Sequence, residues 1–183
     1  MKILGKRQRY ITTRITGVRT VQRYLSGVAR RSNSFSAQFR WARRELAQWN
    51  AQNFATLGSA SGKAWNALDT EYQAWKIINY GSAPTMVRTG DLYRDLVTLR
   101  GGPNHVGHKT ASFGTDLEYA KFHQMGTRFM PARKIVFEPV DFQEELGNRI
   151  LEHLIYGPKG THMYKKVKSI FNRTRTMRDL AKP

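Results

Sequence analysis

The chain has 183 residues, of which 40% are hydrophobic, which suits one domain of ordinary size with extensions outside its core. It contains no cysteine, so disulfides and thiolate metal sites are excluded. No apolar run approaches the length that spans a bilayer, and the basic N-terminal residues lead into no apolar signal-type segment. We therefore expect no membrane partner and no need for an oxidising compartment.

The net charge of +18 is concentrated at the two ends of the chain. Residues 1–44 contain twelve Lys or Arg and no acid, and residues 146–183 contain nine basic residues against two acids. Residues 45–145 are nearly neutral, with ten basic and eleven acidic residues. This distribution predicts three parts, namely a basic N-terminal arm over 1–34, a core domain over 35–157 and a basic C-terminal helical extension over 158–183.

Like charges at this density repel one another unless a polyanion or an acidic partner neutralises them. Nucleic acid and the acidic surface of a neighbouring subunit are both candidate partners, and a pair of solvated tails is the simpler alternative. The residues expected to contact DNA or neighbouring subunits are Arg7, Arg9, Arg14, Arg19, Arg23, Arg30, Arg31, Lys165, Lys166, Lys168, Arg173 and Arg175.

Hydrophobic periodicity gives most of the expected helices. Segment 10–31 fits two patterns, an alternating strand at its start and a helix with Val18, Val21 and Leu25 on one face. Further helices are predicted over 35–57, 69–79, 89–96, 116–125, 139–156 and 161–180. Ser34, Asp69 or Thr70, and Thr89 are the expected N-caps, and Leu68, Tyr72 and Trp75 are expected to face inward.

Turn-forming and β-type residues fill the remaining core. GSASG, residues 58–62, is predicted to be a flexible link, and Met86-Val87 to be extended. Two strands are expected over 97–100 and 109–113, joined by GGPNHVGH. A short apolar strand is expected over 134–137.

No group of side chains has the spacing of a catalytic or metal site. His105 and His108 are three residues apart in a glycine-rich turn, but no third ligand is evident. Asp116, Glu118 and His123 form a nuclease-like set, yet on a helix Asp116 and His123 would be about two turns apart. We therefore expect no catalytic residue, no cofactor and no metal, and we expect the chain not to be an enzyme.

Five short motifs follow one another between Gly62 and Pro139. In chain order they are Gly62-Lys63-Ala64-Trp65 with Leu68 and Lys76; Met86-Val87-Arg88-Thr89-Gly90-Asp91-Leu92; Phe113-Gly114-Thr115 followed by Tyr119-Ala120; Phe122-His123-Gln124-Met125-Gly126; and Pro131-Ala132-Arg133. Their order and spacing resemble the G-x-x-W-x-x-L, T/S-G-x-L, G-T/S…Y-A, H-Q-x-G and P-A-R segments of the phage virion morphogenesis and tail-completion family, which includes neck and tail-terminator-like proteins of long-tailed phages.

The matching residues are suited to structural roles. Gly90 and Gly126 lie at expected helix ends, where a missing Cβ relieves the backbone. Pro131 favours an extended entry to the following segment, and the Arg133 fork suits a carboxylate or a pair of carbonyl groups. His123 and Gln124 can join their helix to a neighbouring loop. The basic ends of the chain lie outside the resemblance.

The resemblance implies an α+β core, a small antiparallel sheet covered by helices. It also implies a structural virion protein that completes the tail end or neck as a ring, expected to be six-fold, with genome DNA in its lumen. The implied partners are copies of itself, the tail tube protein and a neck or connector protein, assembled in the host cytoplasm. Two other functions remain open at this point: a basic nucleic-acid-binding module of ribosomal or DNA-packaging type, and a DNA-processing nuclease.

Overall fold

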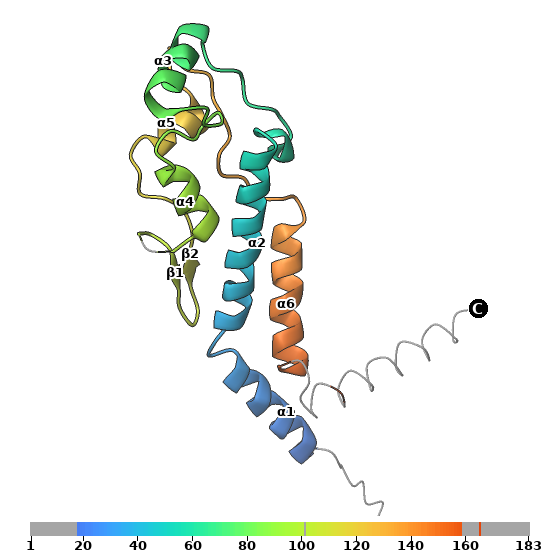
Figure 1. The fold of residues 1–183 in the computed structure, drawn as a ribbon. Helices are drawn as coiled ribbons and strands as arrows, with labels where there is room; N and C mark the ends of the chain where they lie inside the picture. The colour runs from blue at the N-terminus through green and yellow to red at the C-terminus, as the bar shows by residue number, and fades with distance from the viewer. Residues whose placement is uncertain (1–17, 101, 159–164, 166–183) are drawn as a thin grey trace, which may run out of the picture.

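Two long antiparallel helices form the axis of the molecule (Figure 1). The structure is a computed structural model that describes residues 18–100, 102–158 and Lys165. Helix α2 (Ser36–Ala55) packs against α6 (Phe142–Tyr156) on one side and against α4 (Asp91–Thr98) on the other. No helix within these ranges is both long and apolar enough to cross a bilayer.

The shorter elements lie at the two ends of this axis (Figure 1). Helices α3 (Thr70–Tyr80) and α5 (Ala120–Met125) lie together at one end, and α1 (Val18–Arg31) lies at the other. Strands β1 (His105–Val106) and β2 (Ala111–Ser112) form an antiparallel hairpin with His105 opposite Ser112. The described part therefore has six α-helices and a two-stranded sheet, which confirms the α+β prediction.

Aromatic side chains hold α6 to α2. The rings of Trp41 and Phe142 stack with centroids 5.9 Å apart, and the Arg149 guanidinium lies 4.0 Å from the Trp41 centroid. The Phe35 ring meets the edge of His153. The helix predicted over 35–57 is thus confirmed, but Ser34 is not its cap, because Phe35 occupies the N-cap position without a side-chain hydrogen bond.

The main core lies between α2 and α4. Its buried members are Phe54, Trp65, Leu92, Leu96, Ala120 and Ile135. Asn50, on the buried face of α2, donates from Nδ2 to the Leu96 carbonyl at 2.8 Å. This bond satisfies a carbonyl in the last turn of α4, where helices leave such groups without partners.

Three of the β and loop predictions are wrong. Residues 97–98 are the end of α4, and Leu99 closes that helix in a left-handed conformation (φ 46°) instead of forming a strand. Residues 134–137 alternate buried and exposed as a strand does, but side chains and not a second strand pair with their backbone. Met86 is in a left-handed turn (φ 70°) and is not extended.

Two helix-related expectations also need correction. The 58–62 segment is not a flexible link, because Ser59–Ser61 form the 3-10 helix η1 and Trp65 packs on Gly58, where a Cβ would lie 2.4 Å from the Trp65 Cδ1. Helix α5 starts at Ala120 and not at residue 116. In α3 the Asp69 cap is confirmed, as its carboxylate accepts from the amides of Glu71 and Tyr72.

Helix α1 resolves the ambiguity of segment 10–31 for its described part in favour of a helix. Its C-terminal end is attached to α6, since Arg31 donates to the carbonyls of Leu154 (2.7 and 2.9 Å) and Ile155 (3.4 Å). Val18, Val21 and Leu25 remain more than half exposed. The residues before Val18 and the helix expected over 161–180, apart from Lys165, lie outside the described residues.

We expect Arg31→Ala to lower the free energy of unfolding by about 1–2 kcal/mol, because it removes charged donors from carbonyls at the end of α6. Urea denaturation followed by tryptophan fluorescence measures the change. Arg30→Ala is the matched control, because Arg30 is exposed on the same helix turn and should change stability by less than about 0.5 kcal/mol. Equal losses for both variants would show that α1 does not support α6 through Arg31.

Candidate functional site

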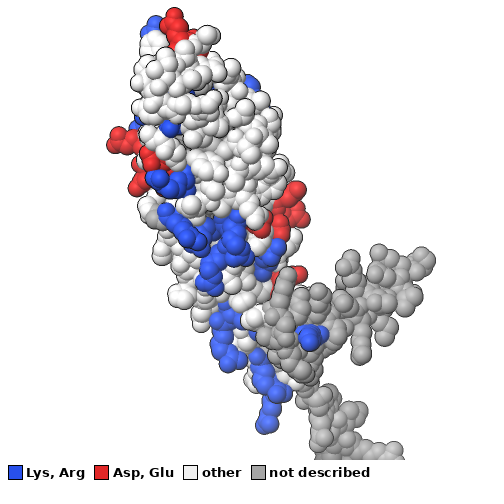
Figure 2. Space-filling view, viewed as in Figure 1, with Lys and Arg blue, Asp and Glu red and all other residues white. Residues whose placement is uncertain are grey.

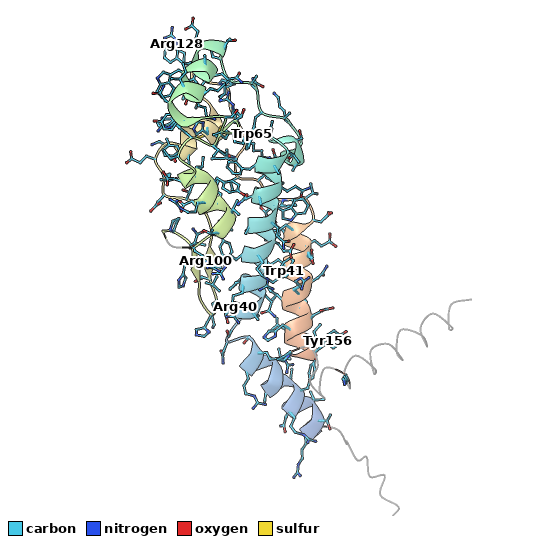
Figure 3. The ribbon with its side chains drawn as sticks, viewed as in Figure 1. Arg40, Trp41, Trp65, Arg100, Arg128 and Tyr156 are labelled. Carbon is cyan, nitrogen blue, oxygen red and sulfur yellow. The ribbon has the colours of Figure 1, made fainter. Side chains whose placement is uncertain are left out.

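The motif residues converge on the extended segment 131–137. The carbonyl of Lys134 accepts two side-chain hydrogen bonds, one from the Trp65 indole at 2.9 Å and one from Asn53 Nδ2 at 3.0 Å. Trp65 and Asn53 are both buried. A single carbonyl therefore connects α2, the segment after η1 and the segment before α6 (Figure 3 labels Trp65).

Arg133 joins the same segment to two further places. Its guanidinium donates to the carbonyls of Asn66 (3.1 Å) and Ala67 (3.2 Å), and its backbone amide donates to the His123 carbonyl at 2.7 Å. Its side chain is buried, and burial lowers the pKa of the guanidinium. The partners of Arg133 are thus a carbonyl pair within its own chain, one of the two possibilities that its fork suggested.

Gln124 pairs with the backbone of the neighbouring loop in three bonds. Its Oε1 accepts from the amides of Ile135 (2.9 Å) and Val136 (3.0 Å), and its Nε2 donates to the Val136 carbonyl at 2.9 Å. The amide side chain therefore takes the place that a neighbouring strand would have. This geometry confirms that Gln124 joins α5 to a loop.

Gly126 and His123 shape the end of α5. A Cβ on Gly126 (φ 77°) would lie 2.7 Å from the Ala132 nitrogen, so only glycine allows this close approach. His123 Nδ1 is buried and has no hydrogen-bond partner among the described residues. Burial, and secondarily the charge of Arg133, lower the pKa of His123 below its ordinary value.

The remaining motif residues fall into three groups. Leu92 and Ala120 are in the core. Thr115 donates to Asp95 of α4, and Gly114 exchanges two hydrogen bonds with the Asn104 side chain. The residues that line a groove with a volume of about 540 Å³ between α3, the start of α4 and α5 include Leu68, Gly90, Tyr119, His123, Pro131 and Arg133.

Large apolar side chains at this end of the molecule are exposed, and of these Phe129 lines the groove while Ile78 and Trp75 lie on α3 outside its lining. Ile78 of α3 is 82% exposed and Phe129 is 89% exposed, while Trp75 is 45% exposed. The prediction that Tyr72 and Trp75 face inward is therefore wrong, and their rings stack on one another instead, with centroids 5.6 Å apart. Several exposed large apolar side chains at one end of a molecule are typical of protein–protein contact sites.

The nuclease-like set is not assembled. Asp116 precedes α5 and lies against Gly102, and the groups acting on the His123 pKa are its buried surroundings and Arg133. Among the described residues, no three His, Asp or Glu side chains are grouped so as to hold a metal ion. What the site can do chemically is to hold backbone segments together and present apolar and charged surfaces.

Sequence reasoning missed some residues that matter here. Asn53 carries no pattern that separates it from other polar residues of α2, and Lys134 acts through its carbonyl. Lys76 is buried and donates from Nζ to the carbonyls of Ala83 (3.0 Å) and Pro84 (2.6 Å), with its pKa lowered by burial. Arg40 and Arg44 of α2 are both exposed, and their four-residue spacing is the signal that places them on one side of the helix as a pair of neighbouring charges.

Together, the fold and site define a small α+β protein whose motif residues hold separate backbone segments together by hydrogen bonds. The sequence profile of the phage virion morphogenesis family matches residues 16–154, and the chain belongs to this family. It is 31% identical over 91 residues to Mu-like prophage FluMu G protein 1 of Haemophilus influenzae (strain ATCC 51907 / DSM 11121 / KW20 / Rd), covering 45% of this chain and 55% of that protein. No solved structure matches. The protein therefore has a role in phage virion morphogenesis.

We expect Gln124→Ala to lower the free energy of unfolding by about 2–3 kcal/mol, because two backbone amides lose their acceptor. Gln124→Glu keeps the oxygen acceptors and should lose less. Chemical denaturation measures both, with Gln73→Ala on the exposed face of α3 as a control that should stay within about 0.5 kcal/mol of the wild type. Gln124→Ala and Gln73→Ala having the same stability would refute the role of Gln124.

The half-buried His123 should make the free energy of unfolding depend on pH. The pKa of His123 in the folded chain lies below its ordinary value of 6.5. At a pH below 6.5 the unfolded chain therefore binds more protons than the folded chain, and the free energy of unfolding decreases as the pH is lowered. We expect the stability loss between pH 7.5 and pH 5.5 to be smaller in His123→Gln than in the wild type. Denaturation curves at both pH values test this, and equal losses would contradict it.

Proposed function

We propose that this chain is a structural subunit that completes the phage tail end or neck and joins the tail to the head. In this proposal copies of the chain form a closed ring, expected to be six-fold, and genome DNA passes through the ring. The further partners are the tail tube protein and a neck or connector protein. Assembly takes place in the host cytoplasm, and the protein ends in the virion without acting as an enzyme.

The observation that carries the proposal is the combination of family membership with the exposed apolar end of the molecule. Trp75 and Ile78 lie on α3, and Phe129 follows α5 and lines the same groove as the motif residues. Aromatic and large aliphatic side chains contribute most to stable contacts between subunits. We assign this end to contact with the next copy, in a heterologous interface that closes into a ring.

The motif chemistry supports a structural role over the two alternatives. Arg133, Gln124 and Trp65 all donate to or accept from backbone groups of their own chain, which is a scaffold's use of such side chains. A monomeric nucleic-acid-binding module would leave the apolar end without a purpose. A nuclease would require acid and histidine groups to act together.

Electron microscopy of the purified protein, combined with its mass by light scattering, tests ring formation. Gold-labelled antibody on virions tests its place at the tail or neck. We expect rings of uniform diameter and label at the head–tail junction. A strictly monomeric protein, or label confined to the distal tail or the capsid, would overturn the proposal.

We expect Ile78→Glu to weaken self-association at least about tenfold, because one central apolar side chain contributes roughly 2 kcal/mol to such an interface. Since Ile78 is 82% exposed, its circular dichroism and melting temperature should stay those of the wild type. Gln73→Glu introduces the same charge at another exposed position of α3 and should leave assembly unchanged. Wild-type assembly by Ile78→Glu would exclude this end as the subunit contact.

A further inference from the structure

The exposed face of α2 carries two arginines one helical turn apart. Arg40 and Arg44 are four residues apart, which places them on the same side of the helix about 6 Å apart along its axis. Arg100 follows α4, and Figure 3 labels Arg100 and Arg40 at a similar level on this face of the molecule. All three side chains are exposed, and we call them the arginine stripe.

Within the part of the chain that the structure describes, no acidic side chain forms an ion pair with the stripe, although Arg44 lines a groove together with Glu152 of α6. The ion pairs found there join Arg94 to Asp91 and Arg149 to Glu145, and no hydrogen bond joins a stripe guanidinium to another described group. Residues 18–44 contain no acid, so α1 and the first half of α2 extend the positive surface. Figure 2 shows the basic side chains gathered along the middle and lower part of this face, with acidic groups on its flanks.

The charge and the donor geometry of the stripe favour a polyanion as its partner. Uncompensated charges at close spacing repel one another and attract a polyanion. The planar fork of each guanidinium matches carboxylate and phosphate oxygens alike, and a row of three such groups suits a partner that carries anionic groups at regular spacing, as a phosphate backbone does. The spacing of Arg40 and Arg44 is also close to two phosphate steps along one DNA strand, about 6.8 Å of helix axis.

The position of α2 decides how DNA can be contacted. Helix α2 is held between α4 and α6, so only its outer side is free, and it cannot enter a major groove as a recognition helix does. A contact made by this side alone reaches phosphates and sugars, which carry no sequence information. Such a contact lets DNA slide past without stopping at any sequence.

We infer that the arginine stripe binds the phosphate backbone of duplex DNA without sequence preference. The inference rests on the proposed function, in which DNA passes through the ring, and it makes the outer face of α2 the surface turned towards the lumen. The basic residues that the sequence predicts to contact DNA lie at the two ends of the chain and outside the stripe. The stripe is therefore a separate DNA contact from the one predicted for the chain ends.

The absence of cysteine from the chain allows a direct test of proximity. Gln48→Cys places a single thiol one turn beyond Arg44 on the exposed side of α2, and Gln73→Cys places one on α3 at the far end of the molecule. Each full-length variant carries a tethered iron chelate that cleaves nearby DNA through hydroxyl radicals. With a 30-base-pair duplex, we expect cleavage from position 48 and little from position 73. Cleavage only from position 73, or none from 48 while the protein is bound, would overturn the inference.

Affinity supplies an independent measure. The variant Arg40→Gln/Arg44→Gln/Arg100→Gln should bind the duplex at least about tenfold more weakly at 0.1 M salt, and its salt slope should fall by about 2–3 because each phosphate contact contributes about 0.9. The control Lys63→Gln/Lys109→Gln/Lys134→Gln removes the same charge from exposed positions outside both the stripe and the residues assigned to the subunit contact. Equal weakening by both variants would mean that total charge alone binds DNA and would refute the stripe.

Two further results separate this inference from the proposed function. If the stripe variant keeps DNA affinity but loses its assembled mass in light scattering, the stripe contacts an acidic subunit surface, and the DNA assignment is wrong while ring formation stands. If the wild type is monomeric but cleavage from position 48 persists, the DNA assignment stands and the ring proposal fails.

Discussion

The carbonyl of Lys134 is the group on which the arrangement of this protein depends. It accepts hydrogen bonds from Trp65 and Asn53 and so ties α2 to two later segments, one shortly after α2 and one 81 residues after Asn53. Both donors are buried, so a donor that loses this carbonyl would keep an unsatisfied polar group in the interior, which lowers the free energy of unfolding. The neighbouring bonds of Arg133 and Gln124 extend the same principle, since side chains take over the backbone pairing that a larger sheet would provide.

The pairing of segment 131–137 with side chains, in place of a larger sheet, bears on function. With segment 131–137 fixed by side chains, α3 and α5 lie at one end of the axis, and Ile78 of α3 and Phe129 after α5 stay exposed for a partner. Helices α4 and α6 pack against α2, so its outer side remains exposed to solvent and carries Arg40 and Arg44. A subunit with an apolar end and a basic flank has the two surfaces that the proposed ring needs, one for its neighbour and one for DNA.

Sequence reasoning recovered what periodicity and capping encode, and failed where tertiary partners decide. The stripes of α2 and α6 and the Asp69 cap are local patterns, and they were predicted. Side chains of residues 134–137 alternate between exposed and buried, as they would in a β-strand. A segment whose backbone pairs with the Gln124 side chain shows the same alternation, so the sequence pattern does not distinguish it from a strand. Motif order identified Trp65, Gln124 and Arg133, but which carbonyls they meet depends on the folded chain. Trp75 was placed inward because an apolar stripe predicts a covered face without saying what covers it.

Hydrogen exchange at the four tryptophan indoles tests the Lys134 contact most directly. Trp41, Trp49, Trp65 and Trp75 give four separate indole N–H signals in a nitrogen-15 NMR spectrum. Since the Trp65 indole is buried and bonded to Lys134, its exchange should be the slowest, approaching the rate set by global unfolding, and that of the 45% exposed Trp75 should be fast. A Trp65 indole that exchanges as fast as Trp75 would contradict the claim that this bond holds the scaffold together.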